Sequence, residues 1–232
     1  MNFEEGQILC FDKPLRWTSF NLVAKVRWIL CHHLGVKKLK VGHAGTLDPL
    51  ATGVLIVCTG RATKQIDRLQ AGTKEYVATL QLGATTPCFD LERPIDKTYP
   101  TNHITLDLIN QVLPRFRGRI EQVPPTFSAC KIDGHRAYKL ARKGEEVELK
   151  PKILVIDELE LLDFNPELMQ LSLRIVCSKG TYIRALARDI GQALDSGAHL
   201  IALRRTRIGD VTVEQCMKIE DFEPWLEKVM EE

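Results

Sequence analysis

Residues 42–53 place three glycines between two stretches that we expect to be strands, residues 36–41 and residues 54–58. Gly42, Gly45 and Gly53 allow the backbone to turn sharply and allow a ligand to approach it closely. The segment lacks the Gly-Lys-Ser/Thr ending of a phosphate-binding loop and the second carboxylate of a glycosidase pair. The sequence therefore predicts a loop that a ligand can approach, and it disfavours those two kinds of site.

Asp48, within this loop, is the only acidic residue between Lys13 and Lys64. That stretch carries nine basic residues, whereas the whole chain has a formal net charge of only +2. They are Lys13, Arg16, Lys25, Arg27, Lys37, Lys38, Lys40, Arg61 and Lys64. Such a stretch attracts a polyanion. An ionised carboxylate weakens that attraction. Its presence in such a stretch is easier to explain if Asp48 takes part in a reaction, as a nucleophile or as a base. From the residues alone, an ordinary turn before Pro49 explains Asp48 equally well.

Strand and helix patterns alternate irregularly along the chain. Apolar residues at three- and four-residue spacing predict a helix that Ser19 caps and that runs to about Leu34, where Gly35 suits its end. Further helices are expected over residues 105–116, 182–194 and beyond 218, and further strands over residues 7–11, 73–83, 128–132, 152–164, 168–178 and 199–207. The order favours an α+β fold around a mixed, largely antiparallel sheet.

Composition narrows the class of protein and its compartment. No apolar run approaches the length of about 18 residues that a membrane span needs, and the N-terminus lacks the pattern of a signal peptide. The seven cysteines are widely spaced and include no Cys-x-x-Cys pair, so neither a disulfide framework nor a zinc site is expected. We therefore expect a cytoplasmic protein with reduced cysteines.

Residues 42–53, GHAGTLDPLATG, resemble the signature of the TruB family of tRNA pseudouridine synthases. Other segments resemble further motifs of that family, in the family's order and across nearly the whole chain. They are Lys13-Pro14 with Trp17-Thr18-Ser19, Lys74-Glu75-Tyr76, Val123-Pro124-Pro125 with Ser128-Ala129-Cys130-Lys131, Lys179-Gly180-Thr181-Tyr182-Ile183-Arg184, and Leu203-Arg204-Arg205. Arg16 stands where the family usually has glycine, and Phe127 and Cys130 replace the more usual Tyr and Leu.

The resemblance implies the pseudouridine synthase fold as a single catalytic domain over residues 1–232, with no room for the C-terminal PUA domain of many members. It implies isomerisation of uridine to pseudouridine at position 55, in the T-arm of tRNA. The glycosidic bond breaks, the base turns and C5 rejoins the ribose, so no cofactor and no metal are expected. A base within a folded loop must first be flipped out. The expected partner is the T-arm stem-loop, and the protein is expected to act as a monomer.

The resemblance also assigns roles to individual residues. Asp48 becomes the nucleophile, with attack on the ribose and a glycal-type intermediate both open. Tyr76 is expected to stack on the flipped base and Arg184 to pair with Asp48. Binding of the substrate is expected from His43, which would replace the extruded base, from Tyr182 and Leu203 in the uridine pocket, and from Lys13, Lys64 and Lys131. Residues 124–151 are expected to form a mobile segment that closes over the RNA.

Two other functions fit parts of the sequence. The basic first quarter of the chain would also suit a non-catalytic module that binds and folds tRNA. Asp48 could instead serve a hydrolase, although the sequence offers no paired acid, metal cluster or phosphate loop. Core packing is the competing explanation for Tyr76 and Leu203, and a surface helix position is the competing explanation for Arg184.

Overall fold

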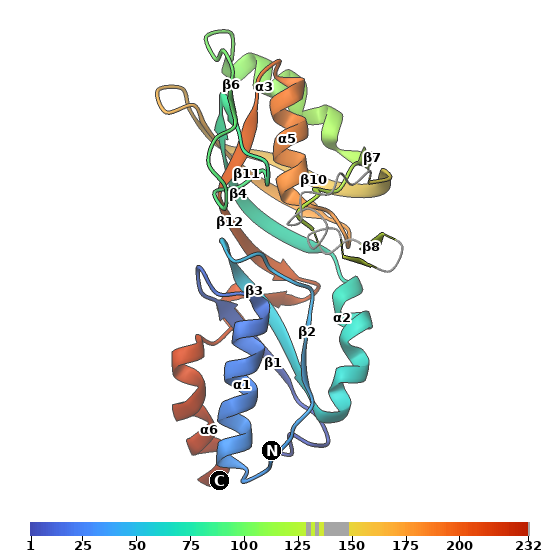
Figure 1. Cartoon of the computed structure of the whole chain (residues 1–232), viewed down its shortest axis with the longest axis vertical. Helices are drawn as coiled ribbons and strands as arrows, with labels where there is room; N and C mark the ends of the chain where they lie inside the picture. The colour runs from blue at the N-terminus through green and yellow to red at the C-terminus, as the bar shows by residue number, and fades with distance from the viewer. Residues whose placement is uncertain (129–130, 133–134, 137–148, 232) are drawn as a thin grey trace. The chain divides into compact units, whose positions relative to one another are not determined.

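The computed structural model describes residues 1–128, 131–132, 135–136 and 149–231 (Figure 1). The chain divides into two compact units, Met1–Tyr76 with Arg204–Glu232, and Val77–Leu203. We call them unit 1 and unit 2. The strands β4 (Lys74–Leu82) and β12 (Ala198–Ile208) contribute residues to both units. Much of the segment that the sequence predicts to be mobile, residues 124–151, lies outside the described residues.

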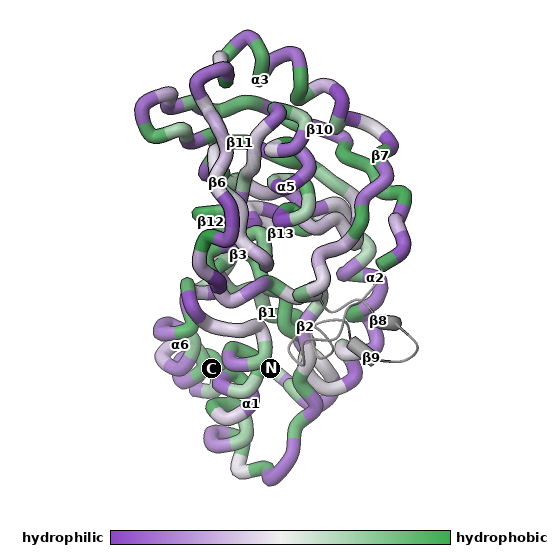
Figure 2. The backbone as a smooth tube through the Cα atoms, turned by 45° about the horizontal axis from the view of Figure 1, so that its top comes forward, coloured by the Kyte–Doolittle hydropathy of each residue, from purple (hydrophilic) through white to green (hydrophobic). Residues whose placement is uncertain are grey.

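Unit 1 is built around the buried strand β3 (Ala51–Thr59). It pairs antiparallel with β1 (Ile8–Lys13) and with β2 (Val41–Ala44). β12 follows β3 in the strand order, and β13 (Val211–Thr212) pairs antiparallel with the end of β12. The continuous apolar run of β3 suits a strand buried on both faces, and Figure 2 colours most of it as hydrophobic.

Helices α1 (Ser19–His33) and α6 (Phe222–Glu231) supply much of the core of unit 1. Their apolar stripes pack with β1 and β3 in one cluster that includes Phe11, Leu22, Leu55 and Phe222. The shorter helices of this unit are η1 (Gly60–Gln65), α2 (Ile66–Ala71), η3 (Val213–Gln215) and η4 (Ile219–Asp221). The Phe11 and Phe222 rings meet edge to face with centroids 5.3 Å apart, so the C-terminal helix is part of this core.

In unit 2 the strands follow the order β4, β11 (Gln170–Cys177), β10 (Lys152–Asn165), β7 (Gly118–Gln122). β10 pairs antiparallel with both β11 and β7. Its helices among the described residues are α3 (Leu106–Val112), η2 (Leu113–Phe116) and the largely buried α5 (Ile183–Ala193). Two small hairpins are formed by β5 (Ala84–Thr85) with β6 (Lys97–Thr98), and by β8 (Lys131–Ile132) with β9 (His135–Arg136). The predicted α+β fold with a largely antiparallel sheet is confirmed.

Two local predictions are wrong. Thr18, not Ser19, caps α1: its hydroxyl accepts a hydrogen bond from the Asn21 backbone N–H, and the Thr18 backbone N–H donates one to Asn21 Oδ1. Residues 36–40 form no strand, and β2 runs from Val41, the last residue of the predicted strand, to Ala44 inside the predicted loop. β2 exists because its backbone pairs with the buried end of β3, and local β-propensity does not reveal that long-range partner.

Candidate active site

The loop that carries Asp48 joins β2 to β3 and is fixed to the start of α1. The buried Ser19 hydroxyl donates to the Leu47 carbonyl at 3.1 Å and accepts from the Leu47 N–H at 2.9 Å. The Arg16 N–H donates to the Pro49 carbonyl at 2.7 Å. The half-buried Asp48 therefore stands between two residues whose backbones are held by hydrogen bonds. Arg16 has φ of 66°, a left-handed conformation that glycine adopts most easily, which accounts for the family's preference for glycine there.

A second anchor of the loop is the guanidinium of Arg205, on β12. The residue is only 1% exposed. Its Nε donates to the Val54 carbonyl at 2.9 Å, its Nη2 to the Gly45 carbonyl at 2.9 Å, and its Nη1 to the Thr46 carbonyl at 3.4 Å. Two of these three carbonyls belong to the loop itself. Because buried carbonyls need hydrogen-bond partners, Arg205 fixes the backbone path that leads to Asp48.

Gly53 lets the Arg205 backbone approach β3. A Cβ at this position would lie 2.1 Å from the Arg205 carbonyl oxygen, and φ is +102°. A side chain would therefore both collide with β12 and strain the backbone.

Lys13, at the end of β1, is a buried charge near the loop. Its side chain is fully buried, and its Nζ donates to the carbonyls of Pro14 at 2.8 Å and Trp17 at 2.6 Å. Burial lowers the pKa of Lys13 to about 8, although the negative charge of Asp48 acts in the opposite direction. Lys13 thus places a partly desolvated positive charge in the field of Asp48. The predicted contact of Lys13 with substrate stays a prediction.

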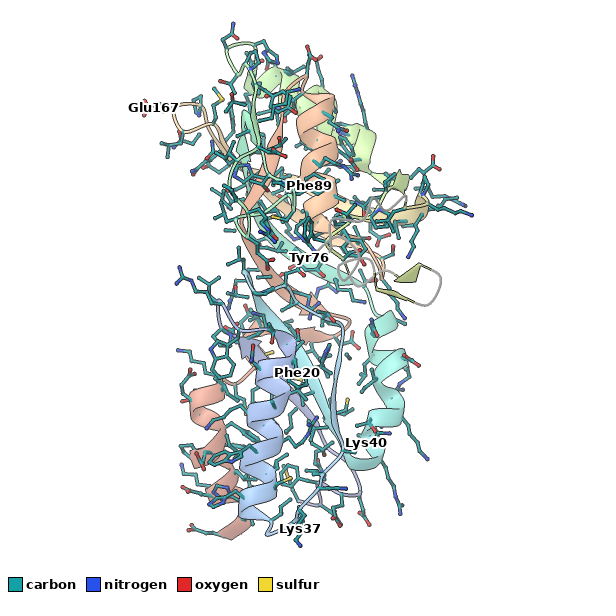
Figure 3. The ribbon with its side chains drawn as sticks, in the orientation of Figure 1. Phe20, Lys37, Lys40, Tyr76, Phe89 and Glu167 are labelled. Carbon is teal, nitrogen blue, oxygen red and sulfur yellow. The ribbon has the colours of Figure 1, made fainter. Side chains whose placement is uncertain are left out.

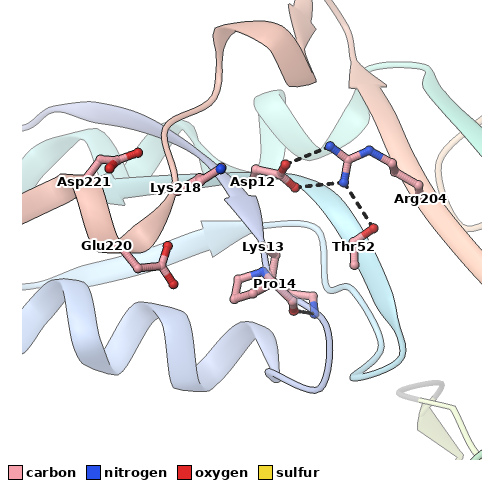
Figure 4. A pocket seen from close by; sticks show the side chains of 8 residues that line it. All are labelled: Asp12, Lys13, Pro14, Thr52, Arg204, Lys218, Glu220 and Asp221. Carbon is pink, nitrogen blue, oxygen red and sulfur yellow. Dashed lines mark hydrogen bonds and ion pairs between the residues drawn. The ribbon is translucent and has the colours of Figure 1, made fainter.

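Beside Lys13 lies an open cavity of about 590 Å³, and most of the residues that line it are polar or charged (Figure 4). Arg204 is one of the residues that line this cavity. Its guanidinium donates two hydrogen bonds to the Asp12 carboxylate, at 3.1 and 2.7 Å, and one to the Thr52 hydroxyl at 3.2 Å. The rest of the lining comes from Lys13, Pro14, Lys218, Glu220 and Asp221. The two adjacent arginines thus have different environments. Arg204 binds a carboxylate at the edge of an open cavity, whereas the buried Arg205 binds backbone carbonyls.

Three further candidates lie in unit 1. His43 is on β2, and its buried Nδ1 has no hydrogen-bond partner among the described residues. Burial and the charge of Arg205 both lower the pKa of His43, which keeps the imidazole neutral at pH 7. Tyr76 is on β4 and only 8% exposed. Lys64 is exposed at the end of η1, where its charge is accessible to an anion.

Most of the basic first quarter is at the surface. The exposed members are Arg16, Lys25, Lys37, Lys38, Lys40, Arg61 and Lys64, and Figure 3 labels Lys37 and Lys40 near the end of α1 and the start of β2. The fully buried Lys13 is the clear departure from the predicted pattern. These exposed side chains suit attraction of a polyanion to unit 1.

Arg184 belongs to unit 2, on the first turn of α5, and is only 6% exposed. Its Nε lies 3.7 Å from the Asp90 carboxylate, and its guanidinium donates to the carbonyls of Cys88 at 3.1 Å and Phe127 at 3.0 Å. A surface helix position is therefore excluded. The predicted pairing of Arg184 with Asp48, which lies in unit 1, stays a prediction.

The remaining candidates are also in unit 2. Tyr182 is the N-cap of α5. The side-chain amide of the buried Gln122 forms hydrogen bonds with both the backbone N–H and the backbone carbonyl of Tyr182. The Tyr182 N–H donates to Gln122 Oε1 at 2.9 Å, and Gln122 Nε2 donates to the Tyr182 carbonyl at 3.2 Å. Leu203 is half-buried on β12. The side chain of Lys131 lies outside the described residues.

Sequence reasoning missed four residues that organise these sites: Ser19 as an anchor of the loop, Arg205, Gln122 and Asp90. Two of them carried a signal. Ser19 lies in the Trp17-Thr18-Ser19 motif, and Arg205 lies two residues after Leu203 in a predicted strand, a spacing that puts both side chains on one face. Gln122 and Asp90 act through hydrogen bonds or charges over long sequence separations, which no local pattern marks.

No helix among the described residues is long and apolar enough to cross a membrane. In the described part of the chain, no cluster of three or more His, Cys, Asp and Glu side chains has the arrangement of a metal site.

Two sequence profiles cover most of the chain. Residues 32–183 match the TruB family pseudouridylate synthase (N terminal domain), and residues 184–232 match the tRNA pseudouridylate synthase B C-terminal domain. A relative named tRNA pseudouridine synthase B, from Phocaeicola vulgatus, is 67% identical over 228 residues, which cover 98% of this chain and 96% of the relative. Another relative of that name, from Flavobacterium johnsoniae, is 51% identical and covers 96% of this chain and 97% of its own length.

Solved structures agree with the profiles. The chain is similar to one in a crystal structure of a Cbf5-Nop10-Gar1 complex, with a TM-score of 0.71 and 29% identity. The match covers 98% of this chain and 57% of the solved one. A structure of an H/ACA RNP bound to a substrate RNA containing 2'-deoxyuridine gives a TM-score of 0.69, 28% identity and coverage of 98% and 56%. From the two profiles and these relatives, the chain belongs to the TruB family of pseudouridylate synthases.

Proposed function

We propose that this enzyme converts uridine to pseudouridine at position 55, in the T-arm of tRNA, with Asp48 as the nucleophile. The relatives that match nearly the whole chain are named tRNA pseudouridine synthase B, which supports tRNA as the substrate. The observation that carries the assignment of Asp48 is the double anchoring of its loop, by Ser19, which binds Leu47, and by Arg205, which binds the carbonyls of Gly45 and Val54. A preorganised, half-exposed carboxylate is what nucleophilic attack requires.

The reaction needs the N1–C1′ bond to break and a C5–C1′ bond to form within one nucleotide. As the N1–C1′ bond breaks, Asp48 would either attack C1′ of the ribose and form a covalent intermediate, or help to form a glycal-type intermediate, and the base would turn before C5 rejoins C1′. The C5 proton is lost and N1 gains one, so the formula is unchanged. Lys13 would stabilise the ionised Asp48, since its desolvated ammonium lies within the field of that carboxylate.

The other candidates would hold the RNA. Tyr76 would stack on the flipped base, with Tyr182 and Leu203 as walls of its pocket. His43 would fill the place that the base leaves, and its lowered pKa suits an uncharged ring that stacks. Arg184 would pair with Asp48. Lys64 and Lys131 would contact phosphates, which gives affinity without base specificity.

The test compares Asp48→Asn with Asp67→Asn, a matched change at an exposed acid on α2 of the same unit. With tRNA tritiated at uridine C5, we expect Asp48→Asn to release no tritium above background and to bind tRNA within about threefold of wild type. Asp67→Asn should match wild type in both assays. Near-normal release from Asp48→Asn would refute the nucleophile.

The site in the RNA needs its own substrates. An isolated T-arm stem-loop should be modified, and a stem-loop with cytidine at position 55 should not, as read by mass spectrometry after chemical derivatisation of pseudouridine. Modification of tRNA elsewhere, with position 55 untouched, would refute the T-arm assignment alone. If the wild type binds and refolds tRNA without making pseudouridine, the protein is a non-catalytic tRNA-binding module.

A further inference from the structure

Two cysteines of unit 1, Cys10 on β1 and Cys216 just after η3, lie opposite each other. Phe11 and Met217 form a parallel bridge. It is closed by the Met217 N–H, which donates to the Cys10 carbonyl at 3.0 Å, and by the Asp12 N–H, which donates to the Met217 carbonyl at 2.9 Å. Cys216 is still extended, with φ of −91° and ψ of 137°. The residues before the bridge, Cys10 and Cys216, are therefore paired in the same register.

The alternation of side chains puts these cysteines on the same face. Phe11 and Met217 pack in the core cluster that α1 and α6 help to form, whereas Cys10 and Cys216 both pack against a second cluster of unit 1, which contains Val54, Ile56 and Cys58. Neighbouring strands lie about 4.8 Å apart, and disulfides join Cα atoms about 4.4 to 6.8 Å apart. Both cysteines are half-exposed, so a small oxidant can reach them. We propose that Cys10 and Cys216 form a reversible disulfide when the protein meets a peroxide.

Cys58 is a poor competitor for Cys10. The register of β1 and β3 pairs Cys10 with Ile56 and Cys58 with Ile8, so Cys58 is a diagonal neighbour of Cys10, at about 7–8 Å. That separation exceeds the usual disulfide range. Cys58 is also fully buried, and burial raises its pKa to about 11, which keeps it a thiol at neutral pH.

The local environment assigns different roles to the two sulfurs. A hydrogen bond from Cys216 lowers the pKa of Cys10, and the same bond together with burial raises the pKa of Cys216. The thiolate is the reactive form, so Cys10 attacks one oxygen of hydrogen peroxide, releases hydroxide and becomes a sulfenic acid. Cys216 then attacks that sulfur and water leaves. In sum, two thiols and one peroxide give one disulfide and two waters, and a dithiol reductant reverses the change.

The bond would tie the C-terminal segment, residues 213–231, covalently to β1. That segment supplies Ile219, Phe222 and Leu226 to the core of unit 1, and without a cross-link it is held by packing and hydrogen bonds. A cross-link removes its local opening from the accessible states. Oxidation would thus stabilise the docking of α6 on the core of unit 1, and reduction would remove that stabilisation.

The test uses the full chain, reduced and then treated with a small excess of hydrogen peroxide. After alkylation and digestion without reductant, mass spectrometry should find the peptides that contain Cys10 and Cys216 linked, with the loss of two hydrogen atoms. Dithiothreitol should separate them. Cys10→Ser and Cys216→Ser should each lack the link, and Cys31→Ser, a change at another half-exposed cysteine, should form it as wild type does.

Hydrogen exchange gives a second readout that does not depend on the substitutions. In wild type, oxidation should slow exchange of the α6 amides by about tenfold or more, and the dithiol should restore the original rate. The proposal is overturned if the link forms only in denaturant, if Cys10 joins another cysteine, or if peroxide drives the cysteines to sulfinic or sulfonic acids without a cross-link.

Discussion

Replacing Arg205 with Met tests whether the guanidinium holds the catalytic loop. Methionine fills a similar apolar volume but donates no hydrogen bond. In the wild type, Arg205 donates hydrogen bonds to the carbonyls of Gly45 and Val54 at 2.9 Å and a longer one to the Thr46 carbonyl at 3.4 Å. The substitution removes all three donors. Each buried acceptor that loses its partner costs about 1–3 kcal/mol. Relief from burying a charge offsets part of that sum, so we expect a net loss of about 2–5 kcal/mol.

The assay is urea unfolding followed by circular dichroism, with tritium release under single-turnover conditions as the second measurement. A loop displaced by about 1 Å can lower the rate of the chemical step by about 100-fold, so Arg205→Met should lose activity even where it stays folded. Arg204→Met is the matched control for stability, because its partly exposed pair with Asp12 contributes about 0–1 kcal/mol. If both variants lose the same small free energy and Arg205→Met keeps the wild-type rate, Arg205 does not position the loop.

Two more predictions concern the same unit. The pKa of Lys13 is lower in the folded protein than in the unfolded chain. Between about pH 8 and 10.5 the unfolded chain therefore binds more protons than the folded protein. The free energy of unfolding should rise with pH across that window, by up to about 3 kcal/mol. Lys13→Met should remove that contribution in urea titrations at a series of pH values, and identical pH profiles would contradict the lowered pKa. Gly53→Ala should cost more than about 3 kcal/mol and disrupt β3, because the new Cβ meets the β12 backbone, whereas Gly35→Ala, with φ of +66° and open space around it, should cost about 1 kcal/mol. Equal melting temperatures for these two glycine variants would rule out the close approach.

The elements whose pattern is local could be predicted from the sequence. The stripe of Leu22, Val26 and Ile29 gives α1, and the alternation that begins at Tyr76 gives β4. The error at residues 36–40 arose because β2, which begins only at Val41, forms by pairing with the C-terminal end of β3. Pairing between distant segments leaves no periodic signal in the shorter partner.

The candidate site shows the same boundary between local and long-range information. Asp48 stood out because it is a single acid in a basic stretch, and motif resemblance named it a nucleophile. The partners that fix its loop did not stand out. Arg205 lies 157 positions after Asp48, and its sequence context does not distinguish it from a surface arginine. It is buried because the carbonyls it binds belong to β3 and to the loop before β3. Asp90 near Arg184 was likewise invisible, since their attraction spans most of unit 2 in sequence.

The bidentate contact of Gln122 with Tyr182 has a consequence for how this enzyme can vary. Two hydrogen bonds set the start of α5 directly from the end of β7, 60 residues earlier in the chain. The position of the Tyr182 backbone therefore does not depend on the length of the chain that connects these points. Insertions or deletions at the turn between β10 and β11 should leave the start of α5 in place, because loop length adds little to the free energy of folding. In this chain that turn can therefore change in length while Gln122 keeps the Tyr182 backbone in place.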